Sequence, residues 1–270
     1  MSKGKSISLG IHVPGLVGHR DTPNWDFLYQ QSTVKDPKWN VGDRVQLPDG
    51  RVFRYAKSGG ACWTGQGNKF MNAIPATGID YSLLAESAAL GATQVVMTNQ
   101  GTVAQTEDGL RGGLIVLKPA TGSTNGEVQM RGIIGNTAGG VSDEITIYLD
   151  AGLTEALTTA SYAFCMPNPY NNIALSSTDY TSVAGLAAVE VAAADVYFWL
   201  QTWGLCWVAP QGECGQTAFG RGLVFRHDGT IQHVDYSSAI GGAYGQNAGF
   251  IVDNNWLNNG STLIMLQIDP

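Results

Sequence analysis

Two Asp-Gly dipeptides of this chain lie within similar phrases, one in the segment from Leu47 to Tyr55 and one in the segment from Val224 to Ile231. In both segments, apolar and polar residues alternate on either side of the dipeptide. Asp-Gly supplies the positive φ angles of a tight two-residue turn. Alternation with period two gives each strand one buried and one solvent-exposed side. The two phrases therefore predict β-hairpins with two-residue turns.

Composition agrees with a chain that turns often. The 270 residues include 35 glycines and seven tryptophans, and only 14% of the residues are charged. Average glycine usage is about 7%. A chain of this length buries roughly three quarters of its unfolded surface, enough for two β domains of ordinary size. We expect two domains and an arm, with some faces covered by other chains.

Charge and hydropathy argue against two classes of partner. The formal net charge of −7 and the pI near 5.0 would repel a phosphate backbone. The longest apolar stretch, Val183 to Ala194, contains Glu190 and is shorter than the ~20 residues of a membrane span. The N-terminal apolar run is broken by His12 and Pro14, unlike a secretion signal. We expect no nucleic-acid partner, no membrane partner, and synthesis in the cytosol.

Short strands separated by turn residues fill the chain after residue 40, which is typical of a sandwich or barrel. The expected fold class is mainly β, with antiparallel β-sandwich or barrel domains, an extended N-terminal arm and one short helix. That helix is predicted near residues 81–90, where Asp80 would be the N-cap and Gly91 the stop. The predicted strands cover residues 94–98, 114–118, 127–134, 144–149, 183–191, 196–203, 206–209, 222–227, 230–236, 250–253 and 262–268.

A domain boundary is expected between Pro167 and Asn172, where two prolines and three asparagines disfavour regular structure. The predicted organisation is an extended arm over residues 1–40, a β domain over 41–166 that contains the short helix, and a second β domain over 167–270.

The predicted arm lacks sustained periodicity but is rich in aromatic residues, among them Trp25, Phe27, Tyr29 and Trp39. An irregular segment with such residues is usually held against a surface. Two interpretations stay open: the arm lies on its own domain, or it lies on a neighbouring subunit.

The four cysteines, Cys62, Cys165, Cys206 and Cys214, lack the CxxC spacing of a zinc site and are expected to be buried free thiols. A Cys206–Cys214 disulfide is the open alternative, if a hairpin places the two side by side.

The nearest approach to a metal site is the second hairpin, which carries His227, Asp228, His233 and Asp235. If His227 pairs with Thr230 across a two-residue turn, His233 lies about 10 Å further along the strand. Asp228 is needed for the turn itself. We therefore predict no metal and no cofactor.

No catalytic motif emerges from the remaining sequence. The Gly-rich segment 59–69 lacks the GxxxxGK[ST] order of a phosphate-binding loop, and we expect a flexible loop there. No Gly-x-Ser-x-Gly elbow is present. Stacking on sugars remains open because Trp and Tyr are plentiful, although most of these rings are expected in cores or interfaces.

Two stretches resemble structural proteins of tailed bacteriophages. The first runs from Gly109 to Val116 and continues in Arg131 to Ala138 and Tyr148 to Asp150. The second runs from Val196 to Cys206, and the hairpin phrase from Asp49 to Tyr55 adds to the likeness. Both resemble virion proteins of the decoration, or cement, class. The motifs are strand signatures, so the family contributes no catalytic residue.

The resemblance implies a non-enzymatic protein that binds the outside of the capsid shell and stabilises the mature head. Its implied partners are the major capsid protein and further copies of itself, with a trimer favoured over a dimer. Its implied location is the virion surface, after synthesis in the host cytoplasm. The capsid or subunit interface would then include Trp25, Phe27, Tyr29 and Trp39. Deleting residues 1–40 is expected to weaken attachment to the shell and to leave the β domains folded.

Three other functional classes stay open: a tail or connector component, a receptor- or glycan-binding virion protein, and an enzyme. Copy number per particle separates the first from a decoration protein, and a glycan array tests the second. Hydrolysis of a host polysaccharide would point to the third.

Overall fold

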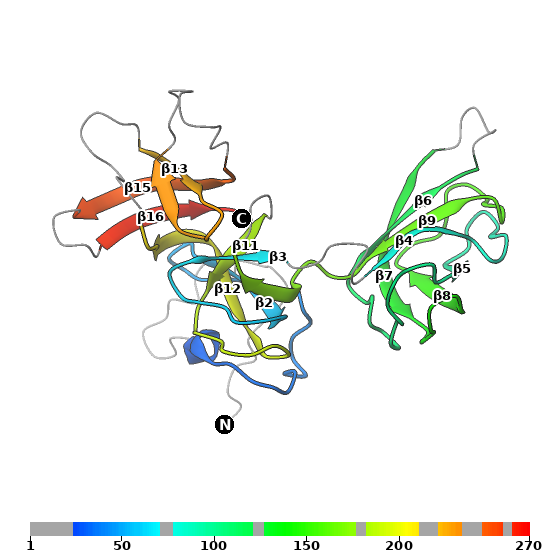
Figure 1. Cartoon of the computed structure of the whole chain (residues 1–270), viewed down its shortest axis with the longest axis horizontal. Coiled ribbons are helices and arrows are strands. Elements are labelled where there is room, and N and C mark those ends of the chain that lie inside the picture. The colour runs from blue at the N-terminus through cyan, green and yellow to red at the C-terminus, as the bar shows by residue number, and fades with distance from the viewer. Residues whose placement is uncertain are drawn as a thin grey trace. The chain divides into compact units, whose positions relative to one another are not determined.

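The computed structural model describes residues 24–70, 78–120, 127–176, 182–210, 221–233, 245–255 and 261–270. In this part of the chain nearly all regular structure is β-strand, and the one helix is the 3-10 turn η1 (Asp26–Tyr29) (Figure 1). The predicted mainly β fold is confirmed. The chain divides into two compact units: unit 1 comprises residues 1–71 and 172–270, and unit 2 comprises residues 72–171. Unit 2 is therefore inserted into unit 1.

Unit 1 contains a closed barrel that continues into an open sheet. Strands β2, β10, β3, β11 and β12 follow one another, and β12 pairs back onto β2 to close the barrel. The sheet then continues from β12 through β16, β15 and β13 to β14, while β1 pairs with β2. The strands are β1 (Arg44–Gln46), β2 (Val52–Ser58), β3 (Gly67–Phe70), β10 (Asn171–Leu175), β11 (Val183–Ala187), β12 (Tyr197–Trp207), β13 (Gly222–Phe225), β14 (Ile231–His233), β15 (Asn247–Asn255) and β16 (Ser261–Gln267).

The long strand β12 belongs to both parts of unit 1. Its first residues pair with β2, and its last residues, from Trp203 to Trp207, pair with β16. Gly204, with φ +95°, lies where the strand passes from one partner to the other, and a Cβ there would come within 2.9 Å of the Arg51 Cα. The two strands predicted over 196–203 and 206–209 are therefore one strand, because the glycine redirects the chain without ending it.

Both Asp-Gly phrases form hairpins, but the two-residue turn predicted for them is wrong. Leu47 closes the first loop against Arg51, and Arg226 closes the second against Thr230, so each loop has three residues. Each loop ends in a glycine with positive φ, at +89° for Gly50 and +79° for Gly229. This is a turn followed by a left-handed residue, the usual form of a three-residue hairpin loop.

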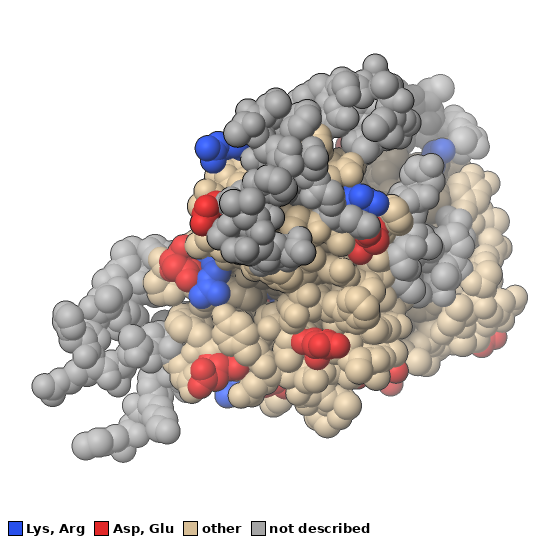
Figure 2. All heavy atoms as spheres, turned by 60° about the vertical axis from the view of Figure 1, so that its left-hand side comes forward, with Lys and Arg blue, Asp and Glu red and all other residues tan. Residues whose placement is uncertain are grey.

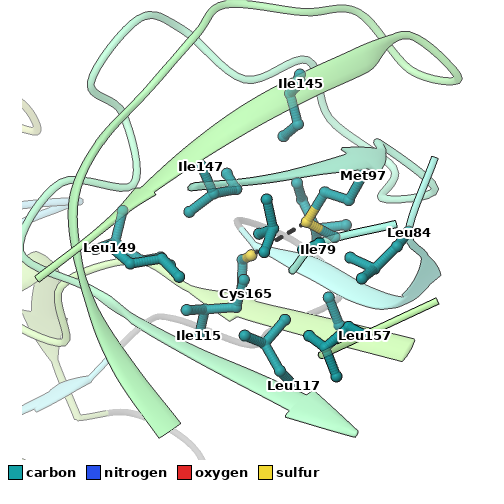
Figure 3. Packing of buried hydrophobic residues seen from close by; sticks show 14 of the residues in the cluster. Ile79, Leu84, Met97, Ile115, Leu117, Ile145, Ile147, Leu149, Leu157 and Cys165 are labelled. Carbon is teal, nitrogen blue, oxygen red and sulfur yellow. Dashed lines mark hydrogen bonds between the residues drawn. The ribbon is translucent and has the colours of Figure 1, made fainter. Parts of the chain in front are cut away.

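Unit 2 is one curled antiparallel sheet in the order β4-β9-β6-β7-β8-β5, drawn mainly in green in Figure 1. A bridge between Leu84 and Met97 joins the two edges. Aliphatic side chains fill the inside, together with Cys165, whose thiol contacts the Met97 sulfur at 3.5 Å (Figure 3). The strands are β4 (Ile79–Leu83), β5 (Gln94–Thr98), β6 (Leu114–Lys118), β7 (Gln129–Asn136), β8 (Glu144–Leu149) and β9 (Tyr162–Met166).

The helix predicted near residues 81–90 is wrong. The first of these residues belong to β4, and those that follow form bridges to another segment of the sheet. The Leu84 N–H donates to the Ser161 carbonyl, and the Ala88 N–H donates to the Leu157 carbonyl. Backbone groups that a helix would pair locally are paired across the sheet, so tertiary contacts override the helical propensity of Ala and Leu.

The compact units differ from the predicted domains over 41–166 and 167–270. The first hairpin belongs with the C-terminal half of the chain, because β2 pairs along its length with β12. The boundary segment is also less irregular than expected, since β10 begins at Asn171.

The predicted arm over 1–40 is only partly described, because residues 1–23 lie outside the described residues. Residues 24–40 pack against β1, β2 and β12 of their own unit, where Leu28 is fully buried. Deleting residues 1–40 would therefore remove part of the unit 1 core. We therefore now expect this deletion to destabilise unit 1, whereas the sequence alone predicts that the β domains stay folded.

Candidate functional site

The outer face of unit 2 is apolar over four neighbouring strands, and we call this surface the β4–β7 face. On β9 and β6 the inward positions are fully buried, while the alternate positions face outward. Phe164, Val116 and Met130 form one cross-strand row on this outer side, and Met166 pairs with Leu114 in the next row. The face also includes Tyr81, Leu83, Val128, Ile134 and Tyr162.

Aromatic rings form the β4 edge of this face. Tyr81 stacks on Tyr162 with ring centroids 4.2 Å apart and meets Phe164 edge-on at 5.3 Å. Tyr81 has φ +45°, which is costly for a residue other than glycine, at the bulge between Ile79 and Ser82. The strained backbone leaves the ring 47% exposed on the outside of the sheet. Strain of this kind clusters at functional sites.

The other half of the same sheet is more polar on its outside. Gln94, Thr98, Glu144 and Thr146 occupy outward positions of β5 and β8. The most exposed apolar side chains of the β4–β7 face, such as Val128, Met130 and Ile134, are each more than half exposed. An apolar patch confined to one half of a sheet is a candidate surface for contact with another protein.

A second apolar surface lies on the C-terminal sheet of unit 1. Leu205, Met265 and Phe250 are cross-strand neighbours, and Trp207 pairs with Leu263 beside them. The alternate residues, such as Ile264, are buried on the opposite side of the sheet. Figure 2 shows one face of the molecule, on which charged side chains are few and scattered among the described residues.

The four aromatic residues predicted at an interface all lie on unit 1. The Phe27 ring stacks on Trp39 at 5.7 Å, and Trp25 packs at 6.1 Å from Phe27. Trp39 is only 7% exposed, whereas Tyr29 is 49% exposed and accepts a hydrogen bond from Arg51. Of the four, Tyr29 therefore offers the most surface to a partner, and Trp39 acts as a core residue. In the described segment, the arm lies on its own domain.

These rings border a small pocket of about 100 Å³ on unit 1. Its walls include Trp199 at 4.9 Å from Trp39, and Tyr55 stacked on Tyr197 at 5.8 Å. Burial raises the pKa of the Tyr55 hydroxyl, which accepts a hydrogen bond from the Asp36 N–H. Polar side chains of Gln30, Gln31, Ser32 and Asp36 complete the lining. The sequence offered only the abundance of Trp and Tyr as a signal for this pocket.

The second hairpin uses Asp228 as a turn residue. Its carboxylate accepts hydrogen bonds from the Thr230 hydroxyl at 2.6 Å and from the Thr230 N–H at 3.0 Å. His227 lies in the loop, so it does not pair with Thr230, while His233 pairs with Leu223 on the ladder. Asp235 lies outside the described residues. The described residues contain no group of three or more His, Cys, Asp or Glu that could hold a metal ion.

Three of the cysteines are free thiols in low-dielectric surroundings, and Cys214 lies outside the described residues. Burial raises the pKa of Cys62 to about 12, and it raises that of Cys165 further. Burial also raises the pKa of Cys206 to about 12, against a hydrogen bond from the Leu266 backbone. Thiols with raised pKa values are poor nucleophiles at neutral pH.

The Gly-rich segment 59–69 is more ordered than the flexible loop expected there, because it leads into β3. Its organising residue is Asn68, which is fully buried. The Asn68 amide nitrogen donates to the carbonyls of Trp63 and Gln66, and its oxygen accepts from the Trp63 N–H. The Asn68 side chain thus holds the loop from within, and backbone hydrogen bonds such as that from the Cys62 N–H to the Val191 carbonyl hold it from outside.

No protein-family model, curated protein or solved structure matches this chain. Among the described residues, no helix has the length and apolar character needed to cross a membrane.

Proposed function

We propose that this chain is a non-enzymatic structural protein of a phage particle, which binds the outside of the capsid shell and stabilises the mature head. The β4–β7 face carries the proposal, because it is an extended apolar surface on a rigid sheet. Interface cores are apolar, rich in aromatic residues and Met, and poor in charge, as this face is.

The resemblance to decoration proteins adds support from the sequence. Two of its segments, Gly109 to Val116 and Arg131 to Ala138, overlap β6 and β7, and these strands carry part of the face. The other segments fall on the hairpin that leads into β2 and on β12. The likeness thus includes parts of two of the proposed contact strands and parts of the two strands that close the barrel.

A decoration protein works by adding contacts that only the mature lattice offers, which stabilises that lattice by mass action. In this proposal the β4–β7 face binds the major capsid protein. The second apolar surface, around Leu205, Phe250 and Trp207, is assigned to contacts between copies of the chain, with a trimer favoured over a dimer. Symmetric repetition multiplies a modest interface around each site of the lattice.

The test is binding of purified protein to expanded shells that lack it, with Met130→Glu as the probe variant. Met130 lies on β7, at one side of the face, and is 56% exposed, so a carboxylate buried there by the partner should weaken binding at least about tenfold. Leu90→Glu is the matched control, because Leu90 is an exposed apolar residue of the same unit outside the face. Equal binding by the parent and Met130→Glu would refute the role of the face.

Copy number decides between decoration and the tail or connector alternative. Quantitative mass spectrometry of purified particles should give a simple ratio of this chain to the major capsid protein. A count of about a dozen or fewer would instead indicate a component at a unique vertex or in the tail.

A further inference from the structure

Two tryptophans that line the aromatic pocket of unit 1 carry indole N–H donors that the described part of the protein does not use. Trp39 is 7% exposed and Trp199 is 2% exposed, and both rings line the pocket. Neither indole N–H donates a hydrogen bond within the described part of the chain, and neither nitrogen is completely sealed from solvent. Buried tryptophans usually find an acceptor for this N–H. Two residues with unused donors line the same pocket, so a bound ligand could supply the acceptors in place of solvent.

The rim of the pocket supplies acceptors as well. Asp36 uses one carboxylate oxygen to accept from the Lys38 N–H, and the other has no hydrogen-bond partner among the described residues. The side-chain amides of Gln30 and Gln31 likewise make no hydrogen bond in the described part of the chain. The pocket therefore combines five aromatic walls, two indole donors, a carboxylate and two amides.

Three classes of ligand can be compared with the aromatic rings, donors and acceptors of this pocket. An ammonium or guanidinium group would suit the rings and Asp36, but it would face the two indole N–H donors with a positive charge. A proline ring would suit the walls and its carbonyl could accept from an indole, but it has no donor for the Asp36 carboxylate. A sugar ring has apolar C–H faces for the aromatic walls, and its hydroxyls both accept and donate hydrogen bonds.

We propose that this pocket binds a single pyranose ring of a carbohydrate, with hydroxyls that accept from Trp39 and Trp199 and donate to Asp36. The volume of about 100 Å³ is enough for one ring to enter in part, with its remaining face in solvent, and too small for a larger ligand. Such a site binds weakly, with a dissociation constant in the millimolar range, about 4 kcal/mol of binding free energy. The inference does not depend on attachment to a capsid.

The experiment uses the full chain and the methyl glycosides of glucose, galactose, mannose and N-acetylglucosamine. Saturation-transfer NMR detects weak binding of each sugar, and tryptophan emission reports on the pocket because two of its walls are indoles. At least one glycoside should show saturation transfer and shift the emission. Absence of both signals for every glycoside at about 50 mM would overturn the proposal.

Two substitutions at the rim of the pocket can locate the site without removing a core side chain. Asp36→Asn removes the charged acceptor and should weaken binding about tenfold, and Gln31→Ala should weaken it about threefold. Trp63→Ala is the control, because Trp63 is 47% exposed on the same unit and does not line the pocket. Unchanged binding by both rim variants, or loss in Trp63→Ala alone, would place the sugar elsewhere and overturn the assignment.

Binding of peptides provides a second test of the carbohydrate assignment. A lysine-containing peptide or a proline-rich peptide that shifts tryptophan emission more strongly than any glycoside would overturn the carbohydrate assignment. Met130→Glu, which alters the β4–β7 face of the other unit, should bind the glycoside like the parent. This separates failure of the pocket from failure of the proposed capsid contact.

Discussion

The two units bury a β-sheet in different ways. Unit 1 closes five strands into a barrel by pairing β12 with β2, so these strands have no free edge. Unit 2 keeps an open sheet that curls until a single bridge joins its edges. Aromatic rings pack on the outside of the unit 1 barrel, whereas the outer face of unit 2 is left in water. The unit 1 barrel is thus covered by its own chain, whereas the unit 2 sheet keeps an apolar outer face that is open for contact.

Each unit should fold when it is separated from the other. Phe70 and Ile173 are cross-strand partners on β3 and β10, so the two chain ends that flank unit 2 are neighbours within unit 1. Replacing residues 72–170 with a short Gly-Ser linker should leave unit 1 folded, because the replacement turns β3 and β10 into a simple hairpin. Residues 72–171 alone should fold as well, since they have their own core. Far-UV circular dichroism and cooperative unfolding of both fragments check this, and a molten unit 1 would refute the inserted-unit interpretation.

The effects of core substitutions on the two units can be measured separately, because all seven tryptophans belong to unit 1 and none to unit 2. Phe198→Ala should destabilise unit 1 by about 3–5 kcal/mol, and Ile115→Ala should destabilise unit 2 by about 2–5 kcal/mol. Both side chains are fully buried. In urea, Phe198→Ala should shift the transition followed by tryptophan emission, while Ile115→Ala should shift only the transition seen by circular dichroism. A tryptophan transition that moves equally in both variants would mean that the units unfold together.

The two Asp-Gly hairpins give a matched pair within unit 1. Gly50 and Gly229 both have positive φ, so Gly50→Ala, with open space around its Cβ, should cost about 1–2 kcal/mol. In Gly229→Ala the Cβ would also collide with the Gly67 backbone of β3, so the loss should exceed about 3 kcal/mol. Urea unfolding followed by tryptophan emission measures both. Equal losses would show that the second hairpin does not pack against the barrel as described.

Local patterns predicted strands well and long-range pairing poorly. The strands over 94–98, 114–118 and 144–149 coincide with β5, β6 and β8, because each alternates between core and solvent. Period two is a local property, so sequence alone can reveal it. The pairing of β2 with β12 joins segments far apart in the chain, and no local pattern encodes it. For the same reason the inserted unit was predicted as part of a continuous domain.

The surfaces could be predicted only in part. Trp25, Phe27, Tyr29 and Trp39 were singled out from the aromatic content of their segment alone. The packing of Phe27 and Trp39 on Trp199 depends on the fold. The β4–β7 face escaped detection because its residues are apolar on both sides of the strands, which also describes a buried strand. Only the exposure of residues such as Met130 distinguishes the two cases.

The stability of unit 1 should depend weakly on pH, and that of unit 2 should not change with it through Asp228. Burial alone would raise the pKa of Asp228, but hydrogen bonds from Thr230 and the nearby Arg226 hold it below its usual value. A carboxylate with a lowered folded-state pKa stabilises the fold above its unfolded pKa of about 4, and this stabilisation is lost as the pH falls through the folded value. Asp228→Asn should therefore be less stable than the parent at pH 7, by less than about 1 kcal/mol because solvent screens this partly exposed group, and the difference should close below a pH of about 4. The transition of unit 2 in the same urea experiment is the internal control, because the substitution should leave it unchanged at every pH. A gap that persists unchanged in acid would show that the hydrogen bonds of the turn stabilise it independently of the charge.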